Sequence, residues 1–244
     1  MIMTEVLRLL KKRGCPYIGK SVDLGRNIKI EGNICYIGDG CVIEDNVRIG
    51  FGAYVGNNCR IGHGSSIGRY AVLLPRTWIG CKTHFGSQCT SQGNNWIGNH
   101  VTINNQSQIG WGMVIEDRVF IGPRFVPSNT KNIKHGRNIP YIVEPSKIKF
   151  GARIGSGVTI LPEVTIGREA FIGAGSVITK SIPDFMLAYG NPARVKREIP
   201  QDERLPEKLY NEYLKRKRAG KAELPSLKTN LLRAVRIVMG GLIP

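Results

Sequence analysis

The stretch from Trp96 to Gly122 reads WIGNHVTINNQSQIGWGMVIEDRVFIG, and isoleucine returns in it at every sixth position. Helices repeat their apolar residues every 3.6 positions, and flat strands repeat them every two. A period of six therefore indicates short strands that meet at corners, where glycine or asparagine supplies the positive φ that a corner needs. Three such sides close one coil, and stacked coils joined by parallel ladders form a parallel β-helix, an all-β fold.

The same period extends over most of the chain. Steps of six from Ile37 meet apolar residues as far as Ile121, except at Ser91, which we interpret as lining a cavity or binding a water. The apolar row resumes at Ile148. Because the step from 121 to 148 is not a multiple of six, the sequence predicts an inserted loop over residues 123–147. Ordered loops of this length are usually functional.

Composition excludes several classes of protein. The chain has 244 residues, a net charge of +17, 30 glycines and 13 prolines. High glycine without matching proline or a three-residue period excludes collagen, and the balance of apolar and charged residues argues against wholesale disorder. No apolar run reaches the roughly 18 residues of a spanning helix, and we read no signal peptide. The charge attracts anions, but no aromatic–basic platform appears, so we expect no nucleic-acid partner.

The cysteines and histidines predict no metal site. No cysteines form a CxxC pair, so a zinc ribbon is disfavoured and we expect reduced thiols in a cytoplasm. Three cysteines fill the small inward position of a repeat and are interpreted as buried hydrophobes: Cys41, Cys59 and Cys89. No histidine pair has a convincing spacing for zinc. His63 and His84 lie in regular coils and are interpreted as exposed surface residues.

The repeats, together with Ile-Gly-Ala-Gly-Ser-Val-Ile-Thr-Lys at 172–180 and Gly-Asn-Pro-Ala-Arg at 190–194, resemble the hexapeptide-repeat acyltransferases. The resemblance covers roughly residues 20–197. It implies a left-handed β-helix, a homotrimer and acyl transfer from coenzyme A, with acetyl-CoA as the co-substrate. Handedness and assembly come from this resemblance and not from the period.

A closer resemblance is to the N-acetyltransferases of nucleotide-linked amino sugars. It rests on Ile-Asn-Asn at 103–105, on Val-Ile-Glu-Asp-Arg-Val-Phe-Ile-Gly-Pro at 114–123 and on Asn129. The model is the enzyme type that acetylates the 3-amino group of a UDP-2-acetamido-3-amino-2,3-dideoxy-glucuronate. The chain departs from that pattern after Asn129, so the sugar stays open.

The resemblance also implies candidate site residues. Asn105 is expected nearest the reacting amine, and His135 in the inserted loop is a candidate base because its pKa is near neutrality. The alternatives are a corner asparagine that tolerates positive φ and a loop histidine that only contacts substrate or solvent. The expected substrate-binding residues are Asn104, Asn129, Arg137 and His100. For Asn129 the alternative is turn chemistry.

Coenzyme A is expected at the last coils. Its long arm would bond to exposed backbone at Gly155, Gly173 and Ala174, where small residues allow close approach. Lys180 and Arg194 would meet its phosphates, unless they are solvated surface charges.

We expect three parts of the chain: a helical cap over residues 1–19, the β-helix over 20–197 and a basic helical tail over 198–244. The tail is predicted to hold one helix at 205–218 and an amphipathic one at 226–240. The amphipathic helix would pack on the β-helix or on a neighbouring subunit. Alternatively, it would lie on an anionic membrane surface.

The leading hypothesis is an acetyl-CoA-dependent N-acetyltransferase that acts on a nucleotide-linked amino sugar. The alternatives are an O-acetyltransferase that acts on a sugar or glycan hydroxyl and a non-catalytic β-helix scaffold. We expect the protein in the cytoplasm, with membrane-surface association as a further option.

Overall fold

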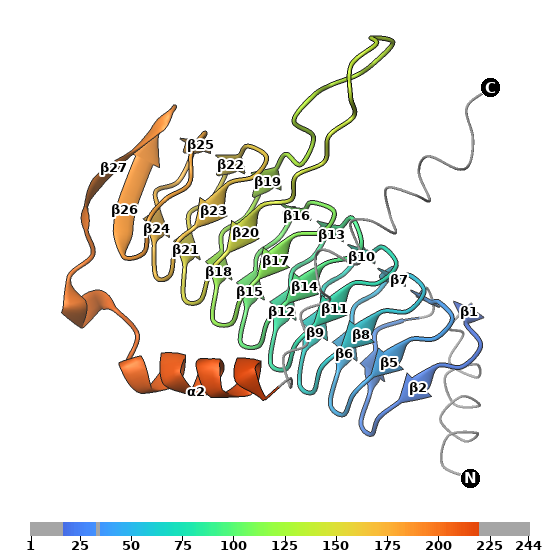
Figure 1. Cartoon of the computed structure of the whole chain (residues 1–244). Helices are drawn as coiled ribbons and strands as arrows, with labels where there is room; N and C mark the ends of the chain where they lie inside the picture. The colour runs from blue at the N-terminus through green and yellow to red at the C-terminus, as the bar shows by residue number, and fades with distance from the viewer. Residues whose placement is uncertain (1–16, 33–34, 220–244) are drawn as a thin grey trace. The chain divides into compact units, whose positions relative to one another are not determined.

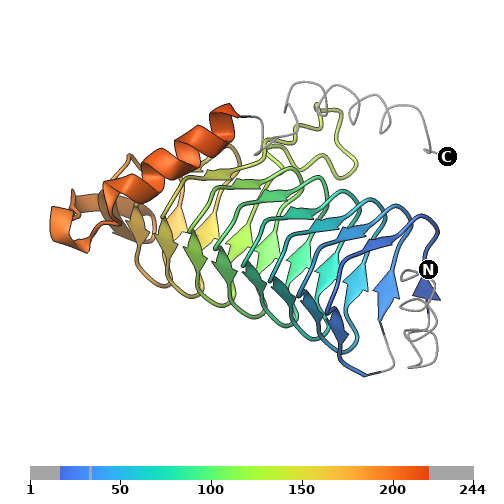
Figure 2. The ribbon, with the colours of Figure 1, turned by 90° about the horizontal axis from the view of Figure 1, so that it is seen from below.

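The computed structural model describes residues 17–32 and 35–219, and the chain divides into two compact units, Met1–Arg204 and Leu205–Pro244. The first unit is a left-handed parallel β-helix, as predicted (Figures 1 and 2). Its rungs are two-residue strands that pair in parallel with the rung one coil away, as Tyr36 does with Tyr54. The predicted cap helix at the N-terminus and the predicted helix at 226–240 lie outside the described residues.

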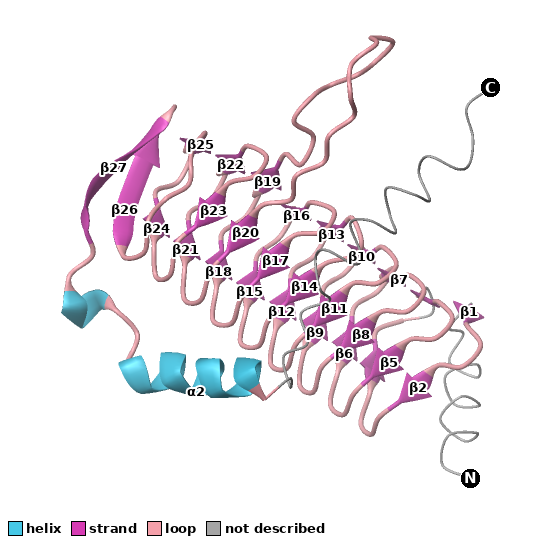
Figure 3. Ribbon diagram, viewed as in Figure 1, coloured by secondary structure: helices cyan, strands magenta, loops and turns pink. Residues whose placement is uncertain are grey.

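The strands form three faces, which we name A, B and C (Figure 3). Face A holds β1 (Tyr17–Ile18), β4 (Tyr36–Ile37), β7 (Tyr54–Val55), β10 (Val72–Leu73), β13 (Thr90–Ser91), β16 (Gln108–Ile109), β19 (Val126–Pro127), β22 (Thr159–Ile160) and β25 (Val177–Ile178). Face B holds β2 (Asp23–Leu24), β5 (Val42–Ile43), β8 (Arg60–Ile61), β11 (Trp78–Ile79), β14 (Trp96–Ile97), β17 (Val114–Ile115), β20 (Lys147–Ile148) and β23 (Thr165–Ile166). Face C holds β3 (Lys29–Ile30), β6 (Arg48–Ile49), β9 (Ser66–Ile67), β12 (His84–Phe85), β15 (Thr102–Ile103), β18 (Phe120–Ile121), β21 (Arg153–Ile154) and β24 (Phe171–Ile172).

The second residue of each rung points into the coil and builds the core. Most of these isoleucines are fully buried, and the free cysteines Cys41, Cys59 and Cys89 are buried with them, as predicted. Burial raises the pKa of the Cys89 thiol to about 11, so this thiol is protonated and unreactive at neutral pH. The cysteines therefore serve as small core residues.

Ser91 is buried but needs neither a cavity nor a water. Its hydroxyl lies 2.7 Å from the Thr77 hydroxyl and donates to Asn95 Oδ1 at 2.6 Å. Asn95 Nδ2 in turn donates to the carbonyl of Gly110 at 2.6 Å. Neighbouring inward positions are polar as well, and together they satisfy the buried serine.

The coil continues further into the predicted insertion than expected. Val126 and Pro127 form β19, which pairs with β22, and Phe125 before them is fully buried. Pro127 occupies the inward position six residues after Ile121. Because proline has no N–H to donate to the preceding coil, the ladder of face A breaks between β16 and β19. The excursion therefore covers residues 128–146, and it rises from the coil beside β19 and β20 in Figure 1.

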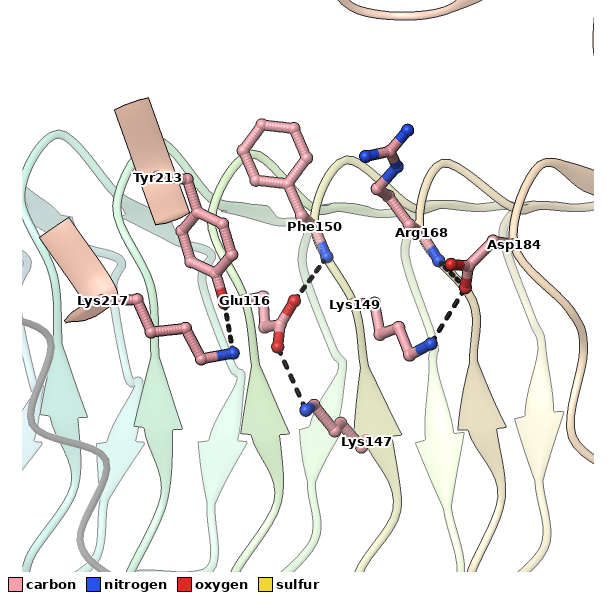
Figure 4. A network of polar contacts seen from close by, with 8 residues as sticks. All are labelled: Glu116, Lys147, Lys149, Phe150, Arg168, Asp184, Tyr213 and Lys217. Carbon is pink, nitrogen blue, oxygen red and sulfur yellow. Dashed lines mark hydrogen bonds and ion pairs between the residues drawn. The ribbon is translucent and has the colours of Figure 1, made fainter. Parts of the chain in front are cut away.

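Ion pairs join the coils across this excursion (Figure 4). Glu116 lies before the loop; its carboxylate accepts a hydrogen bond from the N–H of Phe150 at 3.0 Å and pairs with Lys147 Nζ at 3.1 Å. One coil later, Asp184 accepts from Lys149 Nζ at 2.9 Å. Burial alone would raise the pKa of Asp184. The bonds from Lys149 and from the N–H of Arg168 hold that pKa below its ordinary value.

We expect Glu116→Ala to destabilise the protein by roughly 3 kcal/mol, because it strands the Phe150 N–H and removes the partner of Lys147. The measurement is the free energy of unfolding from urea titration. Glu31→Ala is the control: its ion pair with Arg69 is solvent-exposed, so the expected cost is below about 1 kcal/mol. Equal costs for the two variants would contradict this account of the joint.

A hairpin closes the last coils. β26 (Met186–Gly190) pairs in parallel with β24, and β27 (Ala193–Glu198) pairs antiparallel with β26. A short 3₁₀ helix follows at Gln201–Glu203. In the second unit α2 spans Glu207–Arg218, so the helix predicted over 205–218 begins after Pro206. Within α2, Lys217 Nζ donates to Tyr213 Oη at 3.1 Å (Figure 4). No helix among the described residues is long and apolar enough to cross a bilayer.

Candidate functional site

Asn105 lies at the corner between faces C and A, directly after β15. Its Oδ1 accepts a hydrogen bond from the backbone N–H of Ser87, one coil earlier, at 2.9 Å. Because a backbone N–H can only donate, this contact fixes the oxygen toward the coil and leaves the Nδ2 hydrogens for a ligand. Positive φ falls on Gln106, at 61°, so Asn105 does not serve as the left-handed corner residue. The exposed side chain is suited to donate to a carbonyl oxygen, and it is not a base.

Asn104 is half-buried and presents the opposite atom. Its Nδ2 donates to the carbonyl of Ile121 at 3.0 Å, so its Oδ1 is the atom left to accept from a ligand. His100 is exposed at the corner between faces B and C, with a φ of 55°. Asn104 thus neighbours Asn105, whereas His100 lies at another corner of the coil.

The base of the excursion is a short antiparallel ladder. Thr130 bridges to Val143, and the N–H of Glu144 donates to the carbonyl of Asn129 at 2.8 Å. Lys131 Nζ contacts both Glu144 and Glu163 at 3.0 Å. The hydrogen bond to Glu163, followed by that to Glu144, raises the pKa of Lys131. These contacts hold the two arms of the loop together and place Asn129 at its foot.

His135 and Arg137 lie at the exposed tip of the loop. The turn is tight: Arg137 Nη1 donates to the carbonyl of His135 at 3.1 Å, and Gly136 has a φ of 75°. Among residues 17–32 and 35–219, nothing hydrogen-bonds the His135 ring. Three large apolar side chains of the loop are also exposed: Ile133, Ile139 and Tyr141. Exposed apolar groups of this kind mark contact surfaces.

One chain does not bring Asn105 and His135 together. Asn105 precedes face A, whereas the loop leaves the coil after β19, at the corner between faces A and B. Face A therefore separates the two predicted catalytic residues. Asn104 and Asn105 share one corner, and Asn129, His135 and Arg137 share the loop.

The glycines of the last coils have a different role from the one predicted. The N–H groups of Gly155 and Gly173 already donate within the ladder, to Ile172 and Ala188 at 2.9 Å. A Cβ at Gly155 would lie 2.5 Å from the backbone nitrogen of Ala174, and one at Gly173 would lie 2.8 Å from Tyr189 Cβ. Stacking of the coils therefore requires glycine at 155 and 173, and close approach of a ligand is not the reason.

Two glycines that sequence reasoning missed are open to a ligand. A Cβ at Gly157 or Gly175 would meet nothing within 4 Å, and their φ values are 68° and 69°. Ala174 beside them is exposed. Ser176 ties this edge to the closing hairpin, because its hydroxyl donates to the carbonyl of Gly173 at 2.7 Å and accepts from Gly190 N–H at 3.1 Å. A polar residue at a small inward position was the available signal.

Exposed cations gather at this end of the β-helix. Lys180 follows β25, Arg194 lies on β27, and Lys196 Nζ lies 4.8 Å from the centre of the Tyr189 ring. Within the described part of the chain, none of the three makes an ion pair, so they are available to phosphate groups. A search of the same residues finds no cluster of three or more metal-ligating side chains.

The bacterial transferase hexapeptide model, which spans six repeats, matches residues 40–75 and 145–180. The chain carries the hexapeptide repeats of bacterial transferases. The two matched segments lie on either side of the excursion, in agreement with the coils that the structure shows there. The predicted resemblance is thereby confirmed for the repeats.

Curated relatives match this hexapeptide-repeat chain over short segments. A dTDP-3-amino-3,6-dideoxy-α-D-galactopyranose 3-N-acetyltransferase of Aneurinibacillus thermoaerophilus is 52% identical over 54 residues, 22% of this chain and 28% of the relative. A galactoside O-acetyltransferase of Lactococcus lactis subsp. lactis (strain IL1403) is 54% identical over 46 residues, 19% of this chain and 22% of the relative. The matches thus span about a quarter of these relatives' lengths.

Among solved structures, UDP-N-acetylglucosamine acyltransferase from Campylobacter jejuni superposes with a TM-score of 0.55 at 18% identity. The match covers 89% of this hexapeptide-repeat chain and 88% of that one. At this identity the likeness shows a shared fold, and it agrees with the β-helix described above.

Proposed function

We propose that the protein is an acetyl-CoA-dependent N-acetyltransferase that acts on a nucleotide-linked amino sugar. The observation that carries the proposal is Asn105, an exposed corner amide whose oxygen is engaged and whose N–H groups are free to donate. The hexapeptide repeats of bacterial transferases and the 52% identical segment of a nucleotide-sugar N-acetyltransferase support it.

In this proposal Asn105 Nδ2 donates to the thioester oxygen as it becomes an oxyanion, which lowers the barrier to attack by the sugar amine. Asn104 Oδ1 accepts from the amine or from a sugar hydroxyl and orients it. His135 takes the released proton, or water does so, because a thioester is already activated. Asn129, Arg137 and His100 are proposed to contact the nucleotide sugar.

Coenzyme A is proposed to lie along the last coils. Its arm would run past Ala174 and the open glycines Gly157 and Gly175, where the backbone is accessible. Lys180 and Arg194 would bind its phosphates. This assignment keeps the predicted edge of the β-helix and moves the close approach from Gly155 and Gly173 to their neighbours.

A homotrimer is proposed because face A carries no charge in a chain whose net charge is +17. The outward residue of every rung on this face is uncharged: Tyr17, Tyr36, Tyr54, Val72, Thr90, Gln108, Val126, Thr159 and Val177. The first three rings stack at 4.5 and 4.6 Å. A copy packed over face A could bring its loop to the Asn105 corner. Light scattering should then give three times the chain mass of 27.0 kDa.

A second candidate is an O-acetyltransferase, which the galactoside O-acetyltransferase segment favours. The third is a scaffold without coenzyme A binding. We propose a cytoplasmic location, which the free thiols of the described cysteines support. Association with an anionic membrane through the tail stays a prediction, because that segment lies outside the described residues.

Replacement of His135 separates the two chemistries. A sugar hydroxyl needs a base to remove its proton, whereas an amine can lose its proton to water. We expect His135→Ala to lower kcat by less than about 10-fold if the acceptor is an amine, and by about 10² to 10⁴-fold if it is a hydroxyl. His63→Ala is the control, because His63 is an exposed histidine of a regular coil. A large loss would contradict N-acetylation and favour the second candidate.

A further inference from the structure

A row of polar side chains follows the first strands of face C. Lys29, Arg48, Ser66 and His84 are each the outward residue of a rung, and each pairs in register with the next. These strands lie at the opposite end of the face C sheet from the β26–β27 hairpin (Figure 1). The row is therefore remote from the proposed coenzyme A site.

Lys29 and Arg48 form a like-charged pair without a counter-ion. They lie directly opposite each other on adjacent strands, an arrangement that destabilises a sheet. Neither makes an ion pair within the described residues. The neighbouring acids are already engaged: Glu31 pairs with Arg69 at 2.9 Å, and Asp45 pairs with Arg26 at 2.9 Å. An anion bound between the two cations would neutralise this repulsion.

A groove lies beside the two cations. It has a volume of about 720 Å³ and is lined by Asn27, Ile28, Lys29, Asn46, Arg48 and Gly64. Asn46 Oδ1 accepts from Asn27 Nδ2 at 3.2 Å, so the Asn46 amide hydrogens are left to donate. Gly64 ends this asparagine ladder and keeps the groove open, because a Cβ there would meet only Lys82 Cγ at 3.6 Å.

The row continues with a hydrogen-bonded pair. Ser66 Oγ lies 2.8 Å from Nδ1 of His84. Burial, followed by the charge of Arg48, lowers the pKa of His84. The lowered pKa keeps this ring neutral at pH 7, so it adds no third cation beside Arg48 and can accept the Ser66 proton.

We propose that this groove binds a phosphate group of an anionic ligand. Its polar lining offers two cations and amide donors, and no carboxylate lines it. A phosphate presents several acceptor oxygens and a charge that two adjacent cations can share. The ligand class is a phosphate or diphosphate, either free or carried by a nucleotide. The site is separate from the one proposed for acetyl transfer.

The test is calorimetric titration of the full chain with inorganic pyrophosphate at fixed ionic strength. We expect saturable binding, and a loss of affinity of about 10-fold or more in Arg48→Gln and in Lys29→Gln. Arg60→Gln is the matched control, because Arg60 is an outward arginine of face B and the change in net charge is the same. Its affinity should stay within about 2-fold.

Titration with UDP separates the two sources of the phosphate. Tighter binding of UDP than of pyrophosphate, lost in Arg48→Gln, indicates a nucleotide, and equal affinity indicates phosphate alone. No binding of pyrophosphate, or an equal loss in Arg48→Gln and Arg60→Gln, would overturn the proposal. Because these side chains are exposed and unpaired, we expect the variants to keep the wild-type unfolding midpoint.

Discussion

Replacing Asn105 with alanine is expected to lower kcat for acetyl transfer by about 10² to 10³-fold, the cost of losing one donor to an oxyanion. The side chain is held with its oxygen toward Ser87, so its Nδ2 hydrogens point away from the coil with little freedom to turn. Such a fixed donor stabilises charge that develops during the reaction more than it stabilises the bound substrate. The KM for acetyl-CoA should therefore change much less than kcat.

The control for this variant is Asn57→Ala. Asn57 Oδ1 accepts from the N–H of Asp39 at 3.0 Å, so it makes the same corner bond three coils earlier and at a different corner. Both variants lose one bond to the backbone, and their unfolding midpoints should fall by similar amounts. Only Asn105→Ala should lose activity. Equal activities in the two variants would show that Asn105 has a purely structural role.

Gly155→Ala is expected to destabilise the protein by more than about 4 kcal/mol, or to prevent folding. The added Cβ would lie 2.5 Å from the backbone nitrogen of Ala174 and 2.8 Å from its Cα. These are backbone atoms of the next coil, which is fixed by the ladder bond from Gly155 N–H to Ile172. Relief of the overlap requires the two coils to separate, and ladder bonds would be lost.

Gly157→Ala is the comparison. Its Cβ would meet nothing within 4 Å, but its φ of 68° disfavours any side chain, which costs about 1 to 2 kcal/mol. Urea unfolding followed by circular dichroism measures both variants. If Gly155→Ala proves as stable as Gly157→Ala, the stacking requirement at Gly155 is wrong, and the earlier interpretation of that glycine as a ligand contact returns.

The fold follows from the sequence because each repeat carries its own signal. The isoleucine of a rung, the small residue four places later and the corner glycine agree in every coil, so one error does not displace the rest. Pro127 shows where this reasoning fails. Proline is not expected in a strand, yet only one ladder bond is lost, and the inward position accepts its apolar ring.

The candidate site was predictable in its residue types but not in its geometry. The resemblance singles out Asn105 and His135, yet only the coil count shows that face A lies between them. The free atom of Asn105 also depends on Ser87, a residue one coil away that no local motif includes. The spatial neighbours of a corner residue lie eighteen residues away in the sequence, so they become visible only once the register is known.

His84 illustrates the same point at the other end of the face C sheet. As a lone histidine in a regular coil it was interpreted as a surface residue, and it is exposed. Its contact with Ser66 and the neighbouring charge of Arg48 depend on rungs stacking in register. Gly157 and Gly175 were missed for a related reason, because the space around a glycine is set by the next coil and not by its own repeat.

The central claim, acetyl transfer to the amine of a nucleotide-linked sugar, is tested most directly by free-thiol release from acetyl-CoA. The assay uses the full chain and a panel of nucleotide-linked amino sugars, each matched with its hydroxyl counterpart. We predict turnover with an amino sugar and none with its hydroxyl counterpart. Turnover with hydroxyl sugars alone would contradict N-acetylation, and no turnover together with no calorimetric binding of coenzyme A would contradict both enzymatic candidates.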